Sequence, residues 1–315
     1  MKNIPNMLPK LTIICPVYNE EKVIYLFFDR VKQVISELSA RYQIDLVFLN
    51  NASTDGTYDL LNELRQSHGF VYVITLSRNV GYQRSLECGL NNVLGDIFAF
   101  IDVDCEDPPE MILEFIKYYE QGYDIVYGER LDREENRAIK SLRKLFYHIV
   151  QSVADEDIIL YMAEFSLFTS EVRDAIVQDK NSFPFIRSSI ARVGFRRIGI
   201  PYKRHRRIAG ETNYNLLGMA IFAIAGILSA STLALRLPIY LLPLWLMLTV
   251  LLGIEQIETG NPWFLFANLI LAATYLGGAI AFTALYVART YKNSLGRPNY
   301  LIHRRFTHLQ HLSDE

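Results

Sequence analysis

The chain has 315 residues, of which 50% are hydrophobic, so it carries enough apolar surface for one large domain or two smaller ones. Its 32 Lys and Arg residues and 34 Asp and Glu residues give a formal net charge of -2, which offers no basis for binding nucleic acid. The 3 cysteines lie far apart without CxxC spacing, a pattern typical of reduced thiols in a cytosolic domain. Composition therefore argues against disorder, a disulfide framework and a nucleic-acid partner.

Residues 11 to 202 alternate short β-branched runs with longer amphipathic runs, as α/β domains do. The short runs predict strands over residues 11–15, 44–50, 70–76, 96–102 and 124–128. The segments between them predict helices over residues 20–42, 57–68, 83–94 and 109–122. Because the first four strands are almost continuously apolar and each is followed by a helix, we expect a doubly wound, mostly parallel sheet.

The composition changes after Arg207. Charged residues are absent from three segments, residues 216–235, 237–254 and 263–288. As helices, the last two would be about 27 and 39 Å long, enough to cross a hydrocarbon core of about 30 Å. We therefore predict two transmembrane helices within residues 237–288.

Basic residues flank these apolar segments on both outer sides, whereas the loop between the last two contains only Glu255 and Glu258 as charged residues. The basic residues are Lys203, Arg204, Arg206, Arg207, Arg289, Lys292, Arg297, Arg304 and Arg305. Positively charged flanks stay in the cytoplasm, so the chain should cross the membrane an even number of times. This predicts a cytoplasmic domain over residues 1–210, an interfacial or re-entrant helix over 211–236, and a basic cytoplasmic tail over 289–315.

Polar motifs follow the first four predicted strands, where ligands of parallel sheets bind. They are PVYNEE at residues 16–21, NNASTDGT at 50–57, SRNVGYQ at 77–83 and DVDCEDPPE at 102–110. Asp102 and Asp104 are two apart, which aims both carboxylates to one side of an extended strand. A divalent cation shared with a phosphate-bearing ligand would offset their repulsion. The alternative is a solvated turn that caps the next helix, a role we assign to Asp107.

Together these motifs resemble, in order and spacing, the family-2 glycosyltransferases of the GT-A fold. The resemblance continues through GYDIVYGERLDR at residues 122–133 and RRIAGETNYNLLGMA at 206–220. It points to the membrane-anchored branch of polyprenyl-phosphate hexose transferases, which includes dolichol-phosphate mannose synthase. The resemblance implies an inverting transfer of a hexose from a nucleoside diphosphate sugar to a polyprenyl phosphate, at the lipid bilayer of a bacterial plasma membrane. It leaves open whether the chain forms a homo-oligomer.

The same resemblance implies roles for individual residues. Asp102 and Asp104 would hold the donor and a Mg²⁺ or Mn²⁺ ion, while Arg130 and Arg133 would lie near the phosphates. The nucleotide pocket would be lined by Pro16, Tyr18, Asn19, Glu20, Asn51 and Asp55. The acceptor phosphate is largely dianionic at about pH 7, so it needs less help from a base than a sugar hydroxyl does.

The chain departs from the family pattern at two places. Relatives usually have Gly-Asp-Phe where this chain has Ala163, Glu164 and Phe165, so Glu164 is a candidate base or acceptor-site residue. Its alternative role is that of a strand residue in an ordinary ion pair. Relatives commonly have an Asp pair where this chain has Asn50 and Asn51. An amide oxygen can accept from the single ring N–H of uracil, whereas guanine suits a carboxylate, so uridine is favoured over guanosine.

Two other functions remain open from the sequence. A glycan synthase acting on a hydroxyl acceptor would need a stronger base and usually a translocation path, but the chain has no QxxRW motif and only two predicted spans. A non-catalytic relative could bind lipid phosphate or partner membrane proteins, although the intact DVD and STDGT segments argue against lost activity. The basic residues 203–207 could receive the acceptor phosphate or simply mark the membrane topology.

Overall fold

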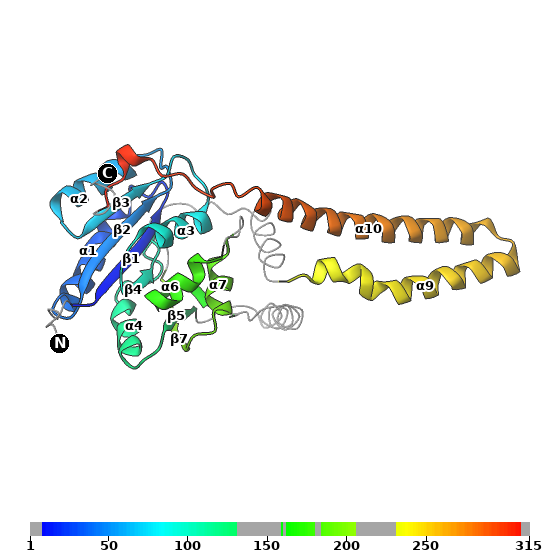
Figure 1. Cartoon of the computed structure of the whole chain (residues 1–315), viewed down its shortest axis with the longest axis horizontal. Helices are drawn as coiled ribbons and strands as arrows, with labels where there is room; N and C mark the ends of the chain where they lie inside the picture. Colours follow the sequence, from blue (N-terminus) through cyan, green and yellow to red (C-terminus); the bar gives the residue numbers. More distant parts are fainter. Residues whose placement is uncertain (1–7, 131–158, 160–161, 180–183, 206–230, 310–315) are drawn as a thin grey trace.

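A computed structural model describes residues 8–130, 159, 162–179, 184–205 and 231–309 (Figure 1). Within these ranges the chain forms an α/β domain, and a long antiparallel pair of helices extends from one side of it (Figure 1). The predicted interfacial helix and Arg133 lie largely or wholly outside the described residues.

The described part of the domain contains one sheet of seven strands in the order β3-β2-β1-β4-β6-β5-β7. The strands are β1 (Lys10–Val17), β2 (Gln43–Asn50), β3 (Val71–Thr75), β4 (Ile97–Phe100), β5 (Ile125–Arg130), β6 (Met162–Thr169) and β7 (Arg197–Tyr202). Only β6 runs antiparallel to its neighbours, β4 and β5. All five predicted strands are present; β6 lies between the predicted strands β4 and β5, and β7 adds an edge strand beside β5. The predicted mostly parallel sheet is confirmed.

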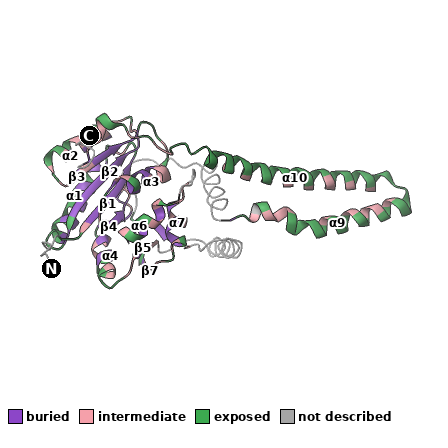
Figure 2. Ribbon diagram, viewed as in Figure 1, coloured by how far each residue is buried: buried purple, intermediate pink, exposed green. Residues whose placement is uncertain are grey.

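Helices cover both faces of this sheet. Their bounds are α1 (Ile24–Leu38), α2 (Thr57–Ser67), α3 (Tyr82–Asn92), α4 (Met111–Glu120), α6 (Ser170–Val177) and α7 (Ile186–Arg192). One core contains residues of α1, α2 and α4, and the other contains residues of α3, α6 and α7. Because side chains alternate along a strand, Ile13 of β1 packs in the first core and Ile14 in the second. The strands are accordingly buried (Figure 2), and the doubly wound arrangement is confirmed.

One glycine of the sheet has a consequence for the site. A Cβ atom at Gly128 of β5 would lie 2.6 Å from Cε1 of Tyr202 on the neighbouring strand β7. That distance is far below van der Waals contact, so a side chain at this position would displace the aromatic ring. Gly128 therefore allows Tyr202 to lie flat enough against β5 to reach the acidic loop after β4.

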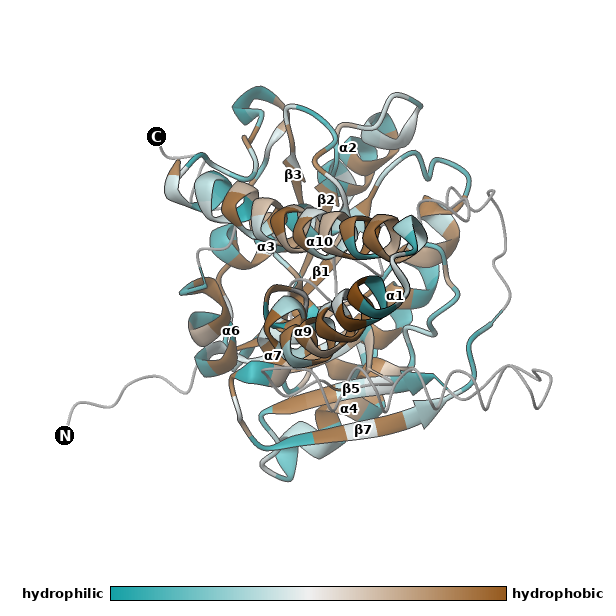
Figure 3. Ribbon diagram, turned by 90° about the vertical axis from the view of Figure 1, so that its right-hand side faces the viewer, coloured by the Kyte–Doolittle hydropathy of each residue, from teal (hydrophilic) through white to brown (hydrophobic). Residues whose placement is uncertain are grey.

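The helical pair consists of α9 (Leu233–Thr259) and α10 (Pro262–Ser294). Gly260 closes α9 with a left-handed backbone, and the Asn261 side chain caps α10 by accepting from the backbone N–H of Trp263. No described residue of either helix is buried, although both helices are largely apolar (Figures 2 and 3). Leu235–Thr259 and Pro262–Ser294 are long and apolar enough to cross a membrane, in agreement with the two predicted spans.

The segment after α10 returns to the domain and lies along β3 at the sheet edge (Figure 1). The backbone N–H of His308 donates to the Val73 carbonyl at 2.7 Å, and that of His303 donates to the Thr75 carbonyl at 2.7 Å. Leu309 is buried in the core on the α3 side of the sheet. The sequence predicted a basic cytoplasmic tail, and the described part of this tail covers an edge strand that would otherwise expose unpaired backbone groups. We call residues 297–309 the returning tail.

Candidate active site

The predicted motifs meet at the carboxyl ends of the parallel strands. The Asn19 side chain accepts from the Thr54 N–H at 2.8 Å, and the Thr57 hydroxyl accepts from the Glu20 N–H at 2.9 Å. These bonds join the loop after β1 to the loop after β2. Among the described residues, the left-handed non-glycine positions are Asn19, Ala52 and Cys105, with φ of 55°, 58° and 57°. Each lies just after β1, β2 or β4, where strained backbone typically accompanies function.

The predicted nucleotide-pocket residues divide into two groups. Pro16 lies in β1, one residue before the strand ends at Val17, and Tyr18 just after the strand is 36% exposed, so its ring is available to a ligand. Asp55 instead accepts from the backbone N–H groups of Glu21 and Thr57, at 3.4 and 3.1 Å. Asp55 therefore positions the loop, and its contact with a nucleotide stays a prediction.

Asn51 is buried and its amide is used within the protein. Its Oδ1 accepts from the Val80 N–H at 2.9 Å, and its Nδ2 donates to Asn79 Oδ1 at 3.0 Å. The neighbouring Asn50 accepts from the Ser53 N–H at 3.0 Å. These two asparagines hold the loops after β2 and β3. The preference for uridine, which was argued from an amide oxygen that accepts from uracil, stays a prediction.

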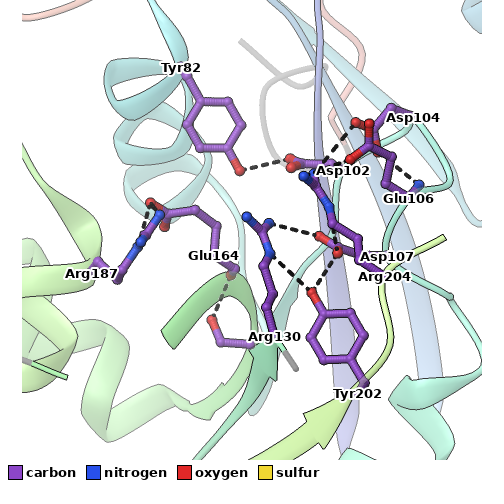
Figure 4. A network of polar contacts seen from close by, with 11 residues as sticks. Tyr82, Asp102, Asp104, Glu106, Asp107, Arg130, Glu164, Arg187, Tyr202 and Arg204 are labelled. Atoms are coloured by element: carbon purple, nitrogen blue, oxygen red, sulfur yellow. Dashed lines mark hydrogen bonds and ion pairs between the residues drawn. The ribbon is translucent and has the colours of Figure 1, made fainter. Parts of the chain in front are cut away.

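Asp102 lies directly after β4 beside other carboxylates (Figure 4). The Tyr82 hydroxyl, from the start of α3, donates to Asp102 Oδ1 at 2.7 Å. Burial, together with the negative charges of Asp104 and Asp107, raises the pKa of Asp102 to about 7. The predicted repulsion between the acidic residues is therefore present, and a bound cation would relieve it.

Asp104 lies near the guanidinium group of Arg204, which belongs to the segment that follows β7. Its Oδ2 lies 3.9 Å from Nη2 of Arg204, whose Nη1 lies 2.6 Å from Glu106 Oε2. Asp104 Oδ1 also accepts from the Glu106 N–H at 3.0 Å. Arg204, one of the basic residues predicted either to receive the acceptor phosphate or to mark the membrane topology, thus lies against the acidic loop.

Asp107 was predicted to cap the next helix, and this interpretation is wrong. Helix α4 begins at Met111, its N-cap residue is Glu110, and no side chain caps it. Asp107 is 1% exposed and accepts from the Tyr202 hydroxyl and from Arg130 Nη2, at 2.5 and 3.3 Å. Nε of Arg204 lies 3.4 Å from the same carboxylate. Because a buried carboxylate needs partners, Asp107 holds two guanidinium groups at the site.

Glu164 lies on β6 and is 7% exposed. Its Oε1 accepts from Gln83 Nε2 at 2.9 Å. The same oxygen accepts from Nε and Nη2 of Arg187, both at 3.2 Å (Figure 4). Its Oε2 is buried and has no hydrogen-bond partner among the described residues. The predicted alternative, an ion pair on a strand, is therefore present, whereas a role as base stays a prediction.

Sequence reasoning missed Gln83, Arg187 and the Tyr202 hydroxyl. Tyr82 and Gln83 directly follow the SRNVG motif, so their place in the chain was a usable signal. Arg187 and Tyr202 carry no local signal, because tertiary packing alone brings α7 and β7 to the ends of the central strands.

The carboxylate oxygens of Asp102 and Asp104 are ligands that Mg²⁺ and Mn²⁺ accept. In the described part of the chain, no three His, Cys, Asp or Glu side chains gather closely enough to hold a metal ion. The donor set therefore fits an ion that takes its remaining ligands from water and a bound phosphate. A mostly parallel sheet with paired acids at its carboxyl edge and guanidinium groups beside them is an arrangement that suits a phosphate-bearing ligand in an α/β protein.

The family described as Glycosyl transferase family 2 matches residues 12–182. The chain belongs to this family and is a glycosyltransferase. It is 30% identical over 305 residues to the uncharacterized glycosyltransferase YkcC of Bacillus subtilis (strain 168), covering 94% of each chain. It is also 30% identical over 305 residues to the bactoprenol glucosyl transferase of Shigella phage SfX, covering 94% of this chain and 99% of that one.

A prophage bactoprenol glucosyl transferase homolog of Escherichia coli (strain K12) is 30% identical over 304 residues, covering 94% of this chain and 99% of that one. Among solved structures, the chain is similar to the mannosyltransferase PcManGT from Pyrobaculum calidifontis in complex with GDP-Man and Mn²⁺. That similarity has a TM-score of 0.46 and 20% identity, and it covers 94% of this chain and 83% of that one.

Proposed function

We propose that this protein transfers a hexose from a nucleoside diphosphate sugar to a polyprenyl phosphate. The main supporting observation is that the acidic residues after β4 lie beside two guanidinium groups at the carboxyl edge of the sheet. Arg130 pairs with Asp107, and Arg204 lies near both Asp104 and Asp107. Such a site suits a substrate with a pyrophosphate. The relatives named bactoprenol glucosyl transferase support the lipid acceptor, because the similarity extends over almost the whole length of both chains.

The reaction is a direct displacement with inversion at the anomeric carbon. An oxygen of the acceptor phosphate forms a bond to that carbon while the bond from the carbon to the donor pyrophosphate breaks, and the nucleoside diphosphate leaves. The leaving group gains negative charge, which Arg130 and Arg204 stabilise from the positions that Asp107 gives them. The acceptor oxygen is already ionised, so the step releases no proton that a strong base must take.

A Mg²⁺ or Mn²⁺ ion would be held by Asp102 and Asp104 and would neutralise charge on the donor phosphates. The Tyr82 hydroxyl fixes one oxygen of Asp102, and the Glu106 N–H fixes one oxygen of Asp104. These bonds leave the second oxygen of each carboxylate for the ion, with Arg204 as its neighbour at Asp104. Arg133 would lie near the same phosphates.

The returning tail supports a membrane arrangement in which both ends of the helical pair lie on one side. Helices α9 and α10 form an antiparallel pair, and the tail after α10 pairs with β3 of the catalytic domain. A pair that spans the membrane would then have both ends on the side that holds the domain, which supports an even number of crossings. Combined with the positively charged flanks, this supports a cytoplasmic domain and tail in an integral membrane protein.

The test is an assay for transfer to lipid. The purified full chain is incubated with Mg²⁺ or Mn²⁺, a polyprenyl phosphate and radiolabelled nucleotide sugars, including uridine- and guanosine-linked hexoses. We expect label in the lipid phase from one donor and none when a polyprenol without phosphate replaces the acceptor. Label on the polyprenol would indicate a hydroxyl acceptor instead, and no label from any donor would contradict the proposal.

A further inference from the structure

We propose that Arg187 binds the phosphate of the lipid acceptor, and that Glu164 and Gln83 orient its guanidinium group. This inference rests on the proposed function, since it assigns a residue to the acceptor of that reaction. It also gives Glu164 a positioning role in place of the candidate role as base.

The guanidinium group of Arg187 is held in a fixed orientation. Arg187 lies in the first turn of α7, and its Nε and Nη2 both donate to Glu164 Oε1 at 3.2 Å. Gln83 Nε2 donates to the same oxygen at 2.9 Å, and Gln83 Oε1 accepts from the Ile186 N–H at 2.9 Å. The first turn of α3, strand β6 and the first turn of α7 are thus joined through one carboxylate oxygen, which fixes the direction of the guanidinium group.

Arg187 is more exposed to solvent than its partner Glu164. The Arg187 side chain is 29% exposed and the Glu164 side chain is 8% exposed. Nη1 of Arg187 has no acceptor within the described ranges, so its two N–H groups can bind an incoming oxygen. The carboxylate therefore lies behind the guanidinium group, and a ligand entering the site meets the positive partner first.

The negative charge of the acceptor phosphate favours Arg187 as the group that binds it. A phosphate monoester is largely dianionic at about pH 7, so a guanidinium group attracts it and a carboxylate repels it. Because its oxygen is already ionised, removal of a proton by Glu164 is not needed. An Arg187 held by Glu164 thus matches this acceptor better than a Glu164 that faces it directly.

The location of Arg187 also suits a lipid acceptor. In Figure 4, Arg187 and Glu164 lie on one side of Asp102, while Asp104, Glu106 and Arg204 lie on the other. Helix α7 belongs to the side of the domain from which α9 and α10 extend (Figures 1 and 3). A phosphate on a membrane lipid arrives from that side. Arg130 lies between these two groups of residues in Figure 4, but it shares the carboxylate of Asp107 with Arg204, whereas Arg187 is held by Glu164. We therefore assign Arg130 and Arg204 to the donor and Arg187 to the acceptor.

The binding test uses farnesyl phosphate as a soluble probe, with farnesol and inorganic phosphate as comparisons, and isothermal titration calorimetry on the full chain in detergent. We expect farnesyl phosphate to bind more tightly than either comparison. Arg187→Gln should weaken its binding about 10- to 100-fold, because charge-assisted bonds to phosphate are lost. Arg192→Gln is the matched control, since Arg192 lies on the same helix but pairs with Asp179. Equal binding by the Arg187→Gln variant and the unaltered protein would overturn the inference.

Loss of Arg187 leaves a buried carboxylate without its cation, so Arg187→Gln could fail to fold. The double variant with Glu164→Gln removes both charges and should fold while still binding farnesyl phosphate weakly. Nucleotide-sugar binding serves as the check on folding, and it should be unchanged in every variant.

Kinetics separates the two roles of Glu164. Glu164→Gln keeps the shape of the side chain, so we expect it to retain most of kcat while raising KM for polyprenyl phosphate. A loss of kcat of about 100-fold or more, with KM unchanged, would instead identify Glu164 as a base and overturn its positioning role. Failure of the proposed function is a different result, because then the unaltered protein itself would transfer no sugar to lipid.

Discussion

The two parts of this molecule use their apolar residues in opposite ways. In the α/β domain the apolar side chains of β1, β2 and β4 are buried between two layers of helices. In α9 and α10 no described side chain is buried, and large apolar residues such as Ile257 and Trp263 are 84% and 75% exposed. The domain satisfies its apolar surface by its own packing, whereas the helical pair needs an apolar environment from outside the chain.

The difference explains where the chemistry lies. A rigid sheet can hold carboxylates and guanidinium groups at fixed positions, because the loops that carry them begin at buried strands. The helical pair contributes no charged side chain to this site among the contacts of the described residues, and it instead sets the side from which a lipid can approach. A substitution in one of the two parts should therefore leave the other part intact.

The largest effect is expected at the donor site. Asp104→Ala should reduce transfer by about 100-fold or more, because it removes a carboxylate that holds the cation and so loses several kcal/mol of charge stabilisation. Asp104 lies in a loop outside both cores, so the thermal unfolding of the domain should change little. Initial rates and thermal melts check the two halves of this prediction. Asp59→Ala on the exposed side of α2 is the control, and full activity of Asp104→Ala would contradict the metal assignment.

The next effect concerns the helical pair. Leu276 lies near the middle of α10 and is 53% exposed, so in water Leu276→Arg would cost almost nothing. In a bilayer it should cost about 2.5–3.5 kcal/mol and reduce the membrane-bound fraction. Fractionation of cell membranes measures this, with Ile257→Arg near the end of α9 as the matched control. Equal membrane fractions for both variants would show that the pair does not span a bilayer.

The third effect tests how firmly the returning tail joins the two parts. Leu309 is 5% exposed and packs in the domain, whereas Leu301 is 60% exposed in the same tail. Leu309→Ala should lower the free energy of unfolding of the domain by about 2–3 kcal/mol, through lost burial and a cavity. Leu301→Ala should change it by less than about 0.5 kcal/mol. Denaturant titrations of the full chain compare them, and equal losses would mean that the tail is not part of the folded domain.

The pattern of apolar residues predicted the strands and helices whose burial it reflects directly. The four apolar runs and their following helices were recognisable because each is buried on both faces or along one stripe. Strand β6 was harder, since its partners β4 and β5 precede it in sequence and its direction depends on them. Asp107 was misread because its prolines suggest a helix start, while its partners Arg130 and Tyr202 are 23 and 95 positions away. The pairing of the tail with β3 was not predicted, because pairing with an edge strand requires no periodicity of its own.

The smallest effect is a pH dependence of the returning tail. Burial against β3 and the nearby charge of Arg65 lower the pKa of His308 from its ordinary value of 6.5. The docked tail thus holds a neutral imidazole, while the detached tail binds a proton near the ordinary value. Docking is fully stable above that value and weakens as the pH falls through it towards the lowered pKa. Thermal melts of the full chain between about pH 7.5 and pH 5.5 should therefore fall more for the unaltered protein than for His308→Gln. Parallel curves for the two proteins would show that His308 does not report on docking.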